Sequence, residues 1–153
     1  MNGAALYGPT HFGSILNYVN EFCHGKSAEE SQYNQKYNIL LILTDGAIMD
    51  LQATVNSIVA ASGLPLSIII IGVGDADFST MEKLDADREP LYSDALRAYQ
   101  SRDIVQFVQF NQFRNDNVLL AREVLKEIPK QMTSYFQSKK IRPNPASPEV
   151  RAA

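Results

Sequence analysis

The chain has 153 residues, of which 45% are hydrophobic and 20% are charged, and its formal net charge is −3. This length suffices for one domain with a substantial hydrophobic core, and the acidic balance argues against a nucleic-acid-binding protein that depends on a basic surface. Cys23 is the single cysteine, which excludes an internal disulfide and a cysteine-rich zinc module and fits a reducing compartment. The longest apolar runs are too short to span a bilayer, and the N-terminus shows no signal-peptide pattern.

The first element that the sequence predicts is a helix after the loop signal Gly8-Pro9. Thr10 can cap this helix, and Gly25 is a natural end for it. Apolar residues recur between them at helical spacing and predict one buried face. That face comprises Phe12, Ile15, Val19, Phe22 and Cys23.

The segment YNILLILTDGAIM, residues 37–49, contains an unbroken aliphatic run that ends at Thr44-Asp45-Gly46. The run Ile39–Leu43 predicts a strand buried on both faces. Asp45 then lies on the loop at the carboxyl end of this strand, which is where ligands bind in open α/β sheets. The residues themselves leave two roles for Asp45 open. It either binds a ligand or satisfies backbone donors of its own loop.

A second helix and a second strand follow. Asp50 is placed to cap the helix, and Gly63 helps to end it. The strand, Leu66–Val73, contains four consecutive isoleucines and runs into Gly72-Val73-Gly74. A dinucleotide-binding fingerprint needs a third glycine where Asp77 stands, so we interpret the glycines as a tight turn.

The C-terminal part predicts three more elements. A short helix over Asp77–Leu84 precedes an irregular charged stretch with one helical turn near Asp94–Tyr99. The third strand is Ile104–Phe110, and its glutamines predict a less buried face near the sheet edge. The last helix spans Asn117–Gln137, with a kink or break at Pro129.

This alternation of helices and strands predicts the α/β class, with a parallel sheet covered by helices on both faces. Three strands with so apolar a first member leave a long unpaired edge, which something should cover. The chain therefore resembles half of a doubly wound domain. A second copy is one partner that such an open edge allows.

Six separated segments are distinctive together. They are LYGPT at 6–10, LLILTDG at 40–46, LPLSIIIIGVG at 64–74, RDIVQFVQF at 102–110, EIPKQ at 127–131 and IRP at 141–143. In this order they resemble the copine-type von Willebrand factor A domain. The similarity runs from Leu6 to Pro143 and predicts a partial domain over residues 1–142, its first strands missing, followed by a proline-rich disordered tail over residues 143–153.

The resemblance implies a metal-ion-dependent adhesion site, in which three loops supply the ligands of a cation. Thr10 corresponds to the threonine loop and Asp45 to the aspartate loop. The Asp-x-Ser-x-Ser loop has no counterpart, because the nearest string, Asp77–Met81, ends in methionine and follows the wrong strand. Mg²⁺ or Mn²⁺ would therefore be held weakly. The alternative is that Thr10 only caps its helix and Asp45 only ties its loop.

The function that the resemblance implies is a non-enzymatic protein-interaction module of a copine, which recruits cytosolic signalling proteins. A cytoplasmic location follows, at the plasma membrane only in the full-length family. Ca²⁺ and phospholipid binding belong to C2 domains, whose sequence is not present in this chain, so any membrane contact is indirect. Nucleic acid is not expected as a partner.

Two other functions compete with this one. The first is a truncated isoform with little independent function. The second is a doubly wound α/β hydrolase or transferase, which we disfavour because the sequence contains no Gly-x-Ser-x-Gly elbow or Walker loop.

Overall fold

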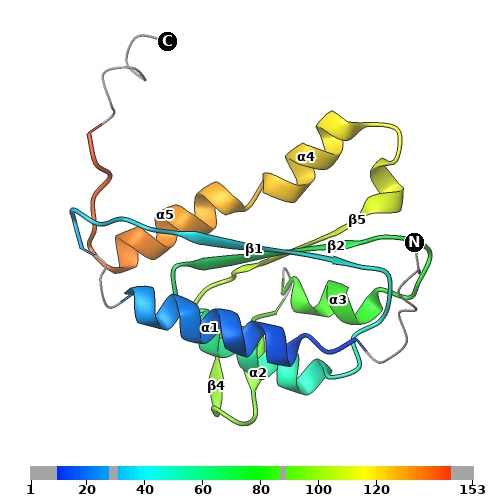
Figure 1. The fold of residues 1–153 in the computed structure, drawn as a ribbon, viewed down its shortest axis with the longest axis horizontal. Coiled ribbons are helices and arrows are strands. Elements are labelled where there is room, and N and C mark those ends of the chain that lie inside the picture. Colours follow the sequence, from blue (N-terminus) through cyan, green and yellow to red (C-terminus); the bar gives the residue numbers. More distant parts are fainter. Residues whose placement is uncertain (1–9, 28–30, 87–88, 146–153) are drawn as a thin grey trace, which may run out of the picture.

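The computed structural model describes residues 10–27, 31–86 and 89–145. Its centre is a three-stranded parallel sheet with the strand order β1-β2-β5. The helices α1, α2 and α3 lie on one face of this sheet, and α4 and α5 lie on the other (Figure 1). The predicted α/β class, with a parallel sheet and helices on both faces, is confirmed.

The elements follow one another in the predicted alternation, with a small hairpin inserted before the last strand of the sheet. They are α1 Gly13–Ser27, β1 Asn38–Thr44, α2 Leu51–Ala61, β2 Leu66–Gly72, α3 Ser79–Leu84, β3 Tyr92–Ser93, β4 Ala98–Tyr99, β5 Val105–Gln109, a 3₁₀ helix Phe110–Phe113, α4 Asn117–Leu125 and α5 Ile128–Ser138. The last predicted helix is therefore two helices, and the predicted interruption lies just before Pro129, which occupies the first turn of α5.

Strand β2 forms the centre of the core. Its side chains are buried on both sides, because β1 and β5 flank it and helices cover both faces. The main apolar cluster fills the space between the sheet and the helices α1 to α3. Glycine ends the strand because a Cβ at Gly72 would lie 2.9 Å from the ring of Phe78, which seals the cluster.

Strand β1 does not match its prediction. Leu40 and Ile42 pack against the core, but the alternate residues Ile39, Leu41 and Leu43 are 52%, 53% and 66% exposed. Burial on both faces was the wrong expectation for this strand because β1 is an edge strand. None of the described helices covers its outer row.

Helix α1 also differs from its prediction. It continues through Gly25 to Ser27, and its buried residues include Leu16 and Cys23. Ile15 and Phe22, which we expected on the buried face, are 51% and 52% exposed. The helix carries two apolar rows, and only one of them faces the core.

Two further expectations in the C-terminal part are wrong. The stretch near Asp94–Tyr99 is a hairpin turn rather than a helical turn, because the Tyr92 and Tyr99 rings pair at 4.8 Å and Ser93 donates to Asn56 of α2. Strand β5 lies at the sheet edge as expected, but Gln106 is buried, 2% exposed. Its side-chain amide, oriented with nitrogen toward Glu127, lies within hydrogen-bond distance of that carboxylate.

Candidate functional site

The two loops that sequence analysis selected meet at the carboxyl end of β1. Thr10 forms a parallel bridge with Ile48, and the Met49 amide donates to the Thr10 carbonyl at 2.9 Å. The Thr10 hydroxyl oxygen lies 3.7 Å from the position that a Cβ on Gly46 would take. The structure thus places Thr10 beside the loop that carries Asp45, although the two residues are far apart in sequence.

The turn that carries Asp45 is tied by its neighbour. The Thr44 hydroxyl donates to the Gly46 carbonyl at 3.3 Å and lies 3.5 Å from the Gly46 amide. Asp45 is exposed, and within the described part of the chain no hydrogen bond or ion pair involves its carboxylate. The loop-tying role that we considered for Asp45 is therefore performed by Thr44, and the Asp45 carboxylate faces solvent.

Asp50 makes the strongest contact between the two loops. It stands at the cap position of α2, as predicted, but its side chain makes no capping hydrogen bond to that helix. Instead its carboxylate accepts from the Phe12 amide at 3.0 Å and from the Gly13 amide at 2.9 Å, at the start of α1. The carboxylate also accepts from the Thr54 hydroxyl at 3.2 Å.

This arrangement corrects the expected role of Thr10 as the cap of α1. Helix α1 begins at Gly13, three residues after Thr10, and Asp50 supplies the acceptor for its first amides. Sequence reasoning missed this partner because it lies 37 and 38 residues from the amides that it binds. No local sequence pattern indicates such a contact.

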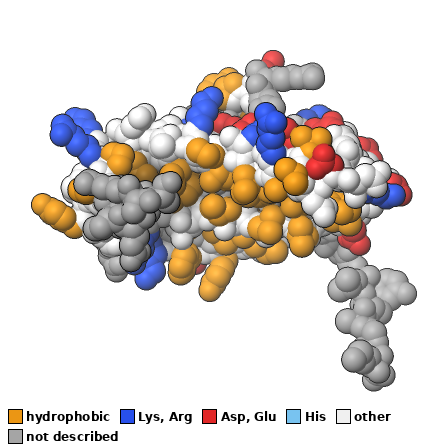
Figure 2. Space-filling view, turned by 90° about the horizontal axis from the view of Figure 1, so that it is seen from above, with side chains coloured by type: hydrophobic (Ala, Val, Ile, Leu, Met, Phe, Trp, Pro, Cys, Tyr) orange, Lys and Arg blue, Asp and Glu red, His pale blue; other side chains and the backbone are white. Residues whose placement is uncertain are grey.

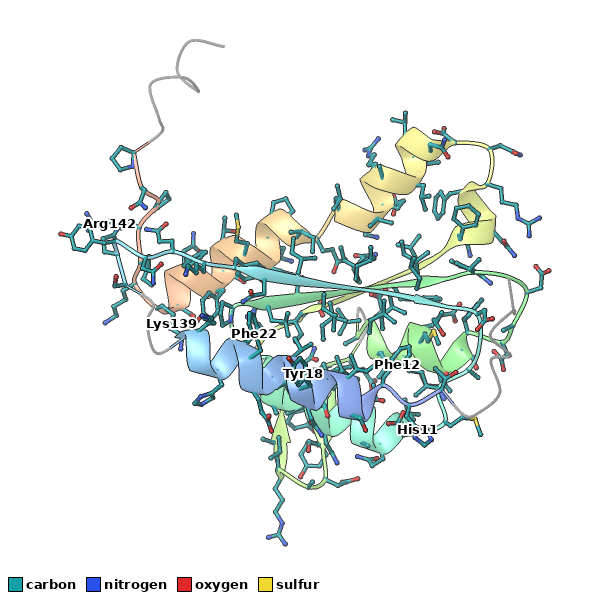
Figure 3. All side chains as sticks on the ribbon, in the orientation of Figure 1. His11, Phe12, Tyr18, Phe22, Lys139 and Arg142 are labelled. Atoms are coloured by element: carbon teal, nitrogen blue, oxygen red, sulfur yellow. The ribbon has the colours of Figure 1, made fainter. Side chains whose placement is uncertain are left out.

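The environment of the Asp50 carboxyl changes its pKa. Burial alone would raise the pKa, but the hydrogen bonds from the Gly13 and Phe12 amides, together with the Thr54 hydroxyl and the charge of His11, lower it below the ordinary value of 3.8. Asp50 therefore stays ionised at neutral pH. It presents a full negative charge to the amino end of α1, where the helix dipole favours an anion. Figure 3 shows His11 and Phe12 at this end of α1.

The oxygen ligands that these loops offer can be compared with those that a hard divalent cation requires. Mg²⁺ prefers six oxygen ligands in octahedral geometry, several of them water. Thr10 and Asp45 would contribute one hydroxyl and one carboxylate. Within the described ranges, no group of three or more histidine, cysteine, aspartate or glutamate side chains is arranged to hold a metal ion. The residues fit part of a coordination shell, and water or another polypeptide must complete it.

The opposite end of the sheet carries a different kind of cluster. The Arg102 guanidinium donates to the Tyr37 hydroxyl at 3.1 Å, the Leu66 carbonyl at 2.8 Å and the Gln131 carbonyl at 3.2 Å. It also lies over the rings of Tyr37 and Tyr135, at 5.8 and 5.2 Å. These contacts join β2 and α5 to Tyr37, which immediately precedes β1. Their role is structural, since they are directed into the molecule.

Exposed apolar rows occur on two elements, the edge strand β1 and helix α1, and we call them together the open flank. Figure 1 places α1 below β1 at the near side of the molecule, and Figure 3 shows Tyr18 and Phe22 along α1. Hydrophobic side chains also form a band on the face that carries α4 and α5 (Figure 2). The open flank comprises Ile15, Tyr18 and Phe22 of α1 with Ile39, Leu41 and Leu43 of β1.

With the fold and the loops described, comparison with known proteins gives the family. A family model for copines matches residues 1–144. The chain belongs to the copine family. Copine-A of Dictyostelium discoideum is 49% identical over 140 residues, which are 92% of this chain and 22% of that protein. Nicotinic receptor-associated protein 1 of Caenorhabditis elegans is 44% identical over 156 residues, covering 95% of this chain and 24% of that protein.

Copine-C of Dictyostelium discoideum is similar at 46% identity over 90% of this chain and 25% of its own length. This copine chain therefore spans about a quarter of the length of the curated relatives that it matches. Its parallel sheet with flanking helices is consistent with a von Willebrand factor A-like domain, as the resemblance implied. In the described ranges of the chain, every helix is too short or too polar to cross a membrane.

Proposed function

We propose that this chain acts as a non-enzymatic protein-interaction module of a copine, which recruits cytosolic signalling proteins through the loops at the carboxyl end of β1. The observation that carries the proposal is the meeting of the Thr10 segment with the loop that carries Asp45, on which Asp45 is exposed. The proposed location is the cytoplasm. Contact with a membrane or with Ca²⁺ would be made by other parts of a full-length copine.

A divalent cation gives these loops a way to bind a partner. Thr10 and Asp45 would hold Mg²⁺ or Mn²⁺, and the cation would supply a charge that attracts a carboxylate of the partner. Because the chain offers few ligands, we expect weak binding of the metal unless the partner or another polypeptide contributes oxygens. The name of the nematode relative states an association with a nicotinic receptor, which supports an interaction role for this chain.

The test of this proposal compares Mn²⁺ binding, followed by electron paramagnetic resonance, in the wild-type chain and in Asp45→Ala. Asp75→Ala is the matched control, because Asp75 is also exposed and lies on the loop after the neighbouring strand. We expect Asp45→Ala to lose binding and Asp75→Ala to keep it. A pull-down from cytosol in Mg²⁺ completes the test. Equal capture of partners by wild type and Asp45→Ala would contradict metal-dependent recruitment.

The open flank favours a second candidate, in which this chain functions only when another polypeptide covers β1. An exposed apolar row beside an unpaired strand edge is a template for association. In isolation the chain would then behave as a truncated form that pairs with a second copy.

Size-exclusion chromatography with light scattering tests this candidate. We expect the wild type to associate as concentration rises and Leu41→Lys to shift toward monomer, because a charge on the edge opposes pairing. Val118→Lys is the control, since Val118 is 81% exposed but lies on α4, away from β1. A monodisperse wild-type monomer at high concentration would contradict this candidate. In the part of the chain that the structure describes, no observation favours the enzyme alternative.

A further inference from the structure

We propose that Asp50 is the positioning residue of the candidate site, because its carboxylate fastens the segment that carries Thr10 to the loop that carries Asp45. The expected effect of Asp50 on metal affinity rests on the proposed function. Its expected effect on the loops does not: without Asp50, the two loops should no longer hold their relative positions.

The first step of the argument is the geometry of the carboxylate. One oxygen accepts the Phe12 amide and the other accepts the Gly13 amide, so both oxygens bind the backbone just after Thr10. Asp50 itself follows Asp45 by only five residues and stands where α2 begins. Helix α2 is anchored in the core through Ile58. The carboxylate thereby connects a rigid helix to the Thr10 segment.

The second step concerns the residue that receives the carboxylate. A Cβ on Gly13 would lie 2.9 Å from an Asp50 carboxylate oxygen and 3.1 Å from the Ala53 Cβ. Side chains essentially never approach so closely, so a Cβ at this position would have to displace the Asp50 carboxylate from its hydrogen bonds to the backbone. Gly13 and Asp50 therefore form a matched pair. The glycine leaves room for the carboxylate, and the carboxylate accepts a hydrogen bond from the glycine amide.

The third step weighs Asp50 against the other connection between the loops. Thr10 is also held by the Met49 amide through one neutral hydrogen bond. Hydrogen bonds to an ionised acceptor are roughly twice as strong as neutral ones, and Asp50 makes two of them to the backbone. The favourable dipole of α1 adds to this difference. Asp50 is thus the stronger of the two connections, and the Met49 bond should depend on it.

The same contacts exclude a different interpretation of this end of α1. The first amides of a helix often bind an external anion. Here the carboxylate of the chain itself already occupies them. The function of Asp50 is to position the loops, and the oxygens available to a cation remain those of Thr10 and Asp45.

The experiment measures amide hydrogen exchange at Met49 by NMR in the wild-type chain, Asp50→Ala and Asp50→Asn. The Met49 amide reports the contact between the loops directly and requires no metal. Loss of two hydrogen bonds to a charged group should accelerate its exchange by about tenfold or more in Asp50→Ala, and by less in Asp50→Asn, which keeps one oxygen. If Asp50→Ala does not fold, Asp50→Asn provides the same comparison.

Asp116→Ala is the matched control. Asp116 caps α4 by accepting from the Leu119 amide at 2.8 Å, far along the chain from these loops. Its removal should also cost stability but leave Met49 exchange, measured relative to core amides, unchanged. Met49 protection equal to wild type in folded Asp50→Ala, or an equal loss in Asp116→Ala, would overturn the inference.

Mn²⁺ titration of the same variants then tests the consequence of the loop contact. We expect affinity to fall by about tenfold in Asp50→Ala, in parallel with the lost charged hydrogen bonds, and to be unchanged in Asp116→Ala. Unchanged affinity in Asp50→Ala would overturn the positioning role. Faster Met49 exchange in Asp50→Ala, together with a wild-type chain that binds no Mn²⁺, would support the fastening by Asp50 and contradict only the proposed metal site.

Discussion

The two ends of β1 are held by different kinds of contact. At the amino end, Arg102 is enclosed by the hydroxyl of Tyr37, backbone carbonyls and the ring of Tyr135. At the carboxyl end, Asp50 binds backbone amides and leaves the Asp45 carboxylate in solvent. The first arrangement directs its hydrogen bonds into the molecule, where they hold elements together. The second uses one acid to hold the loops, and this leaves other oxygens available to a ligand.

The largest effect that separates the two ends should come from Arg102→Ala. The substitution removes one donor each from the Tyr37 hydroxyl and the carbonyls of Leu66 and Gln131, and it removes the ring contacts. We expect a loss of about 3 kcal/mol in unfolding free energy, measured by urea denaturation. Arg114→Ala is the control, because the Arg114 ion pair with Asp75 is exposed and long, at 4.0 Å, and should change stability by less than about 0.5 kcal/mol.

The next largest effect should come from Gly13→Ala at the carboxyl end. The added methyl group collides with the Asp50 carboxylate, so we expect a loss of about 1–3 kcal/mol in thermal unfolding. In an Asp50→Ala background the same substitution should cost less. Gly25→Ala is the control, since a Cβ there meets nothing within 4 Å and alanine favours the helix by about 1 kcal/mol. Equal losses at both glycines would contradict the matched pairing of Gly13 with Asp50.

The loss of stability at acid pH should also distinguish the carboxyl end of β1. The pKa of Asp50 is lowered in the folded chain, so its contribution is present above the ordinary value of 3.8 and is lost as pH falls through the lower folded pKa. Asp50→Asn should therefore flatten the fall in melting temperature between neutral pH and that acid range. If the melting temperature of Asp50→Asn falls with pH as steeply as that of the wild type, Asp50 is not the group responsible.

The smallest effect that we predict is at the C-terminal end of α5, near the amino end of β1. Lys140 has a φ of 58°, a left-handed conformation that favours glycine. Its amide donates to Gln137 and the Ile141 amide donates to Phe136, so the turn closes the helix end. Lys140→Gly should raise stability by about 0.5–1 kcal/mol in calorimetry. Lys139→Gly, where φ is −86°, should give no gain.

The sequence allowed prediction of the sheet and of the loops that meet at its edge, because both depend on local patterns. The apolar runs identified β1 and β2, and the residues after each strand had to lie at the same end of a parallel sheet. The position of Thr10 could not follow from this rule, since the sequence predicts no strand before it. The resemblance to copines supplied that position.

What sequence reasoning missed depends on distant partners. Ile39 and Leu41 are as apolar as the residues of β2, and only the strand order shows that they are exposed. The hairpin near Tyr99 depends on Asn56 of α2, and the role of Asp50 depends on amides 37 and 38 residues away. Periodicity reports which side chains prefer burial, but it does not report which neighbour buries them.

The open flank has a calorimetric consequence. Covering apolar surface lowers the heat capacity of a protein, because the water ordered around that surface is released. A polypeptide that pairs with β1 and covers Leu41 and Phe22 should therefore bind with a distinctly negative change in heat capacity. A partner that binds only through a cation at the Asp45 loop buries little apolar surface and should bind with a change near zero. The temperature dependence of the binding enthalpy would thus show which of the two surfaces a given partner occupies.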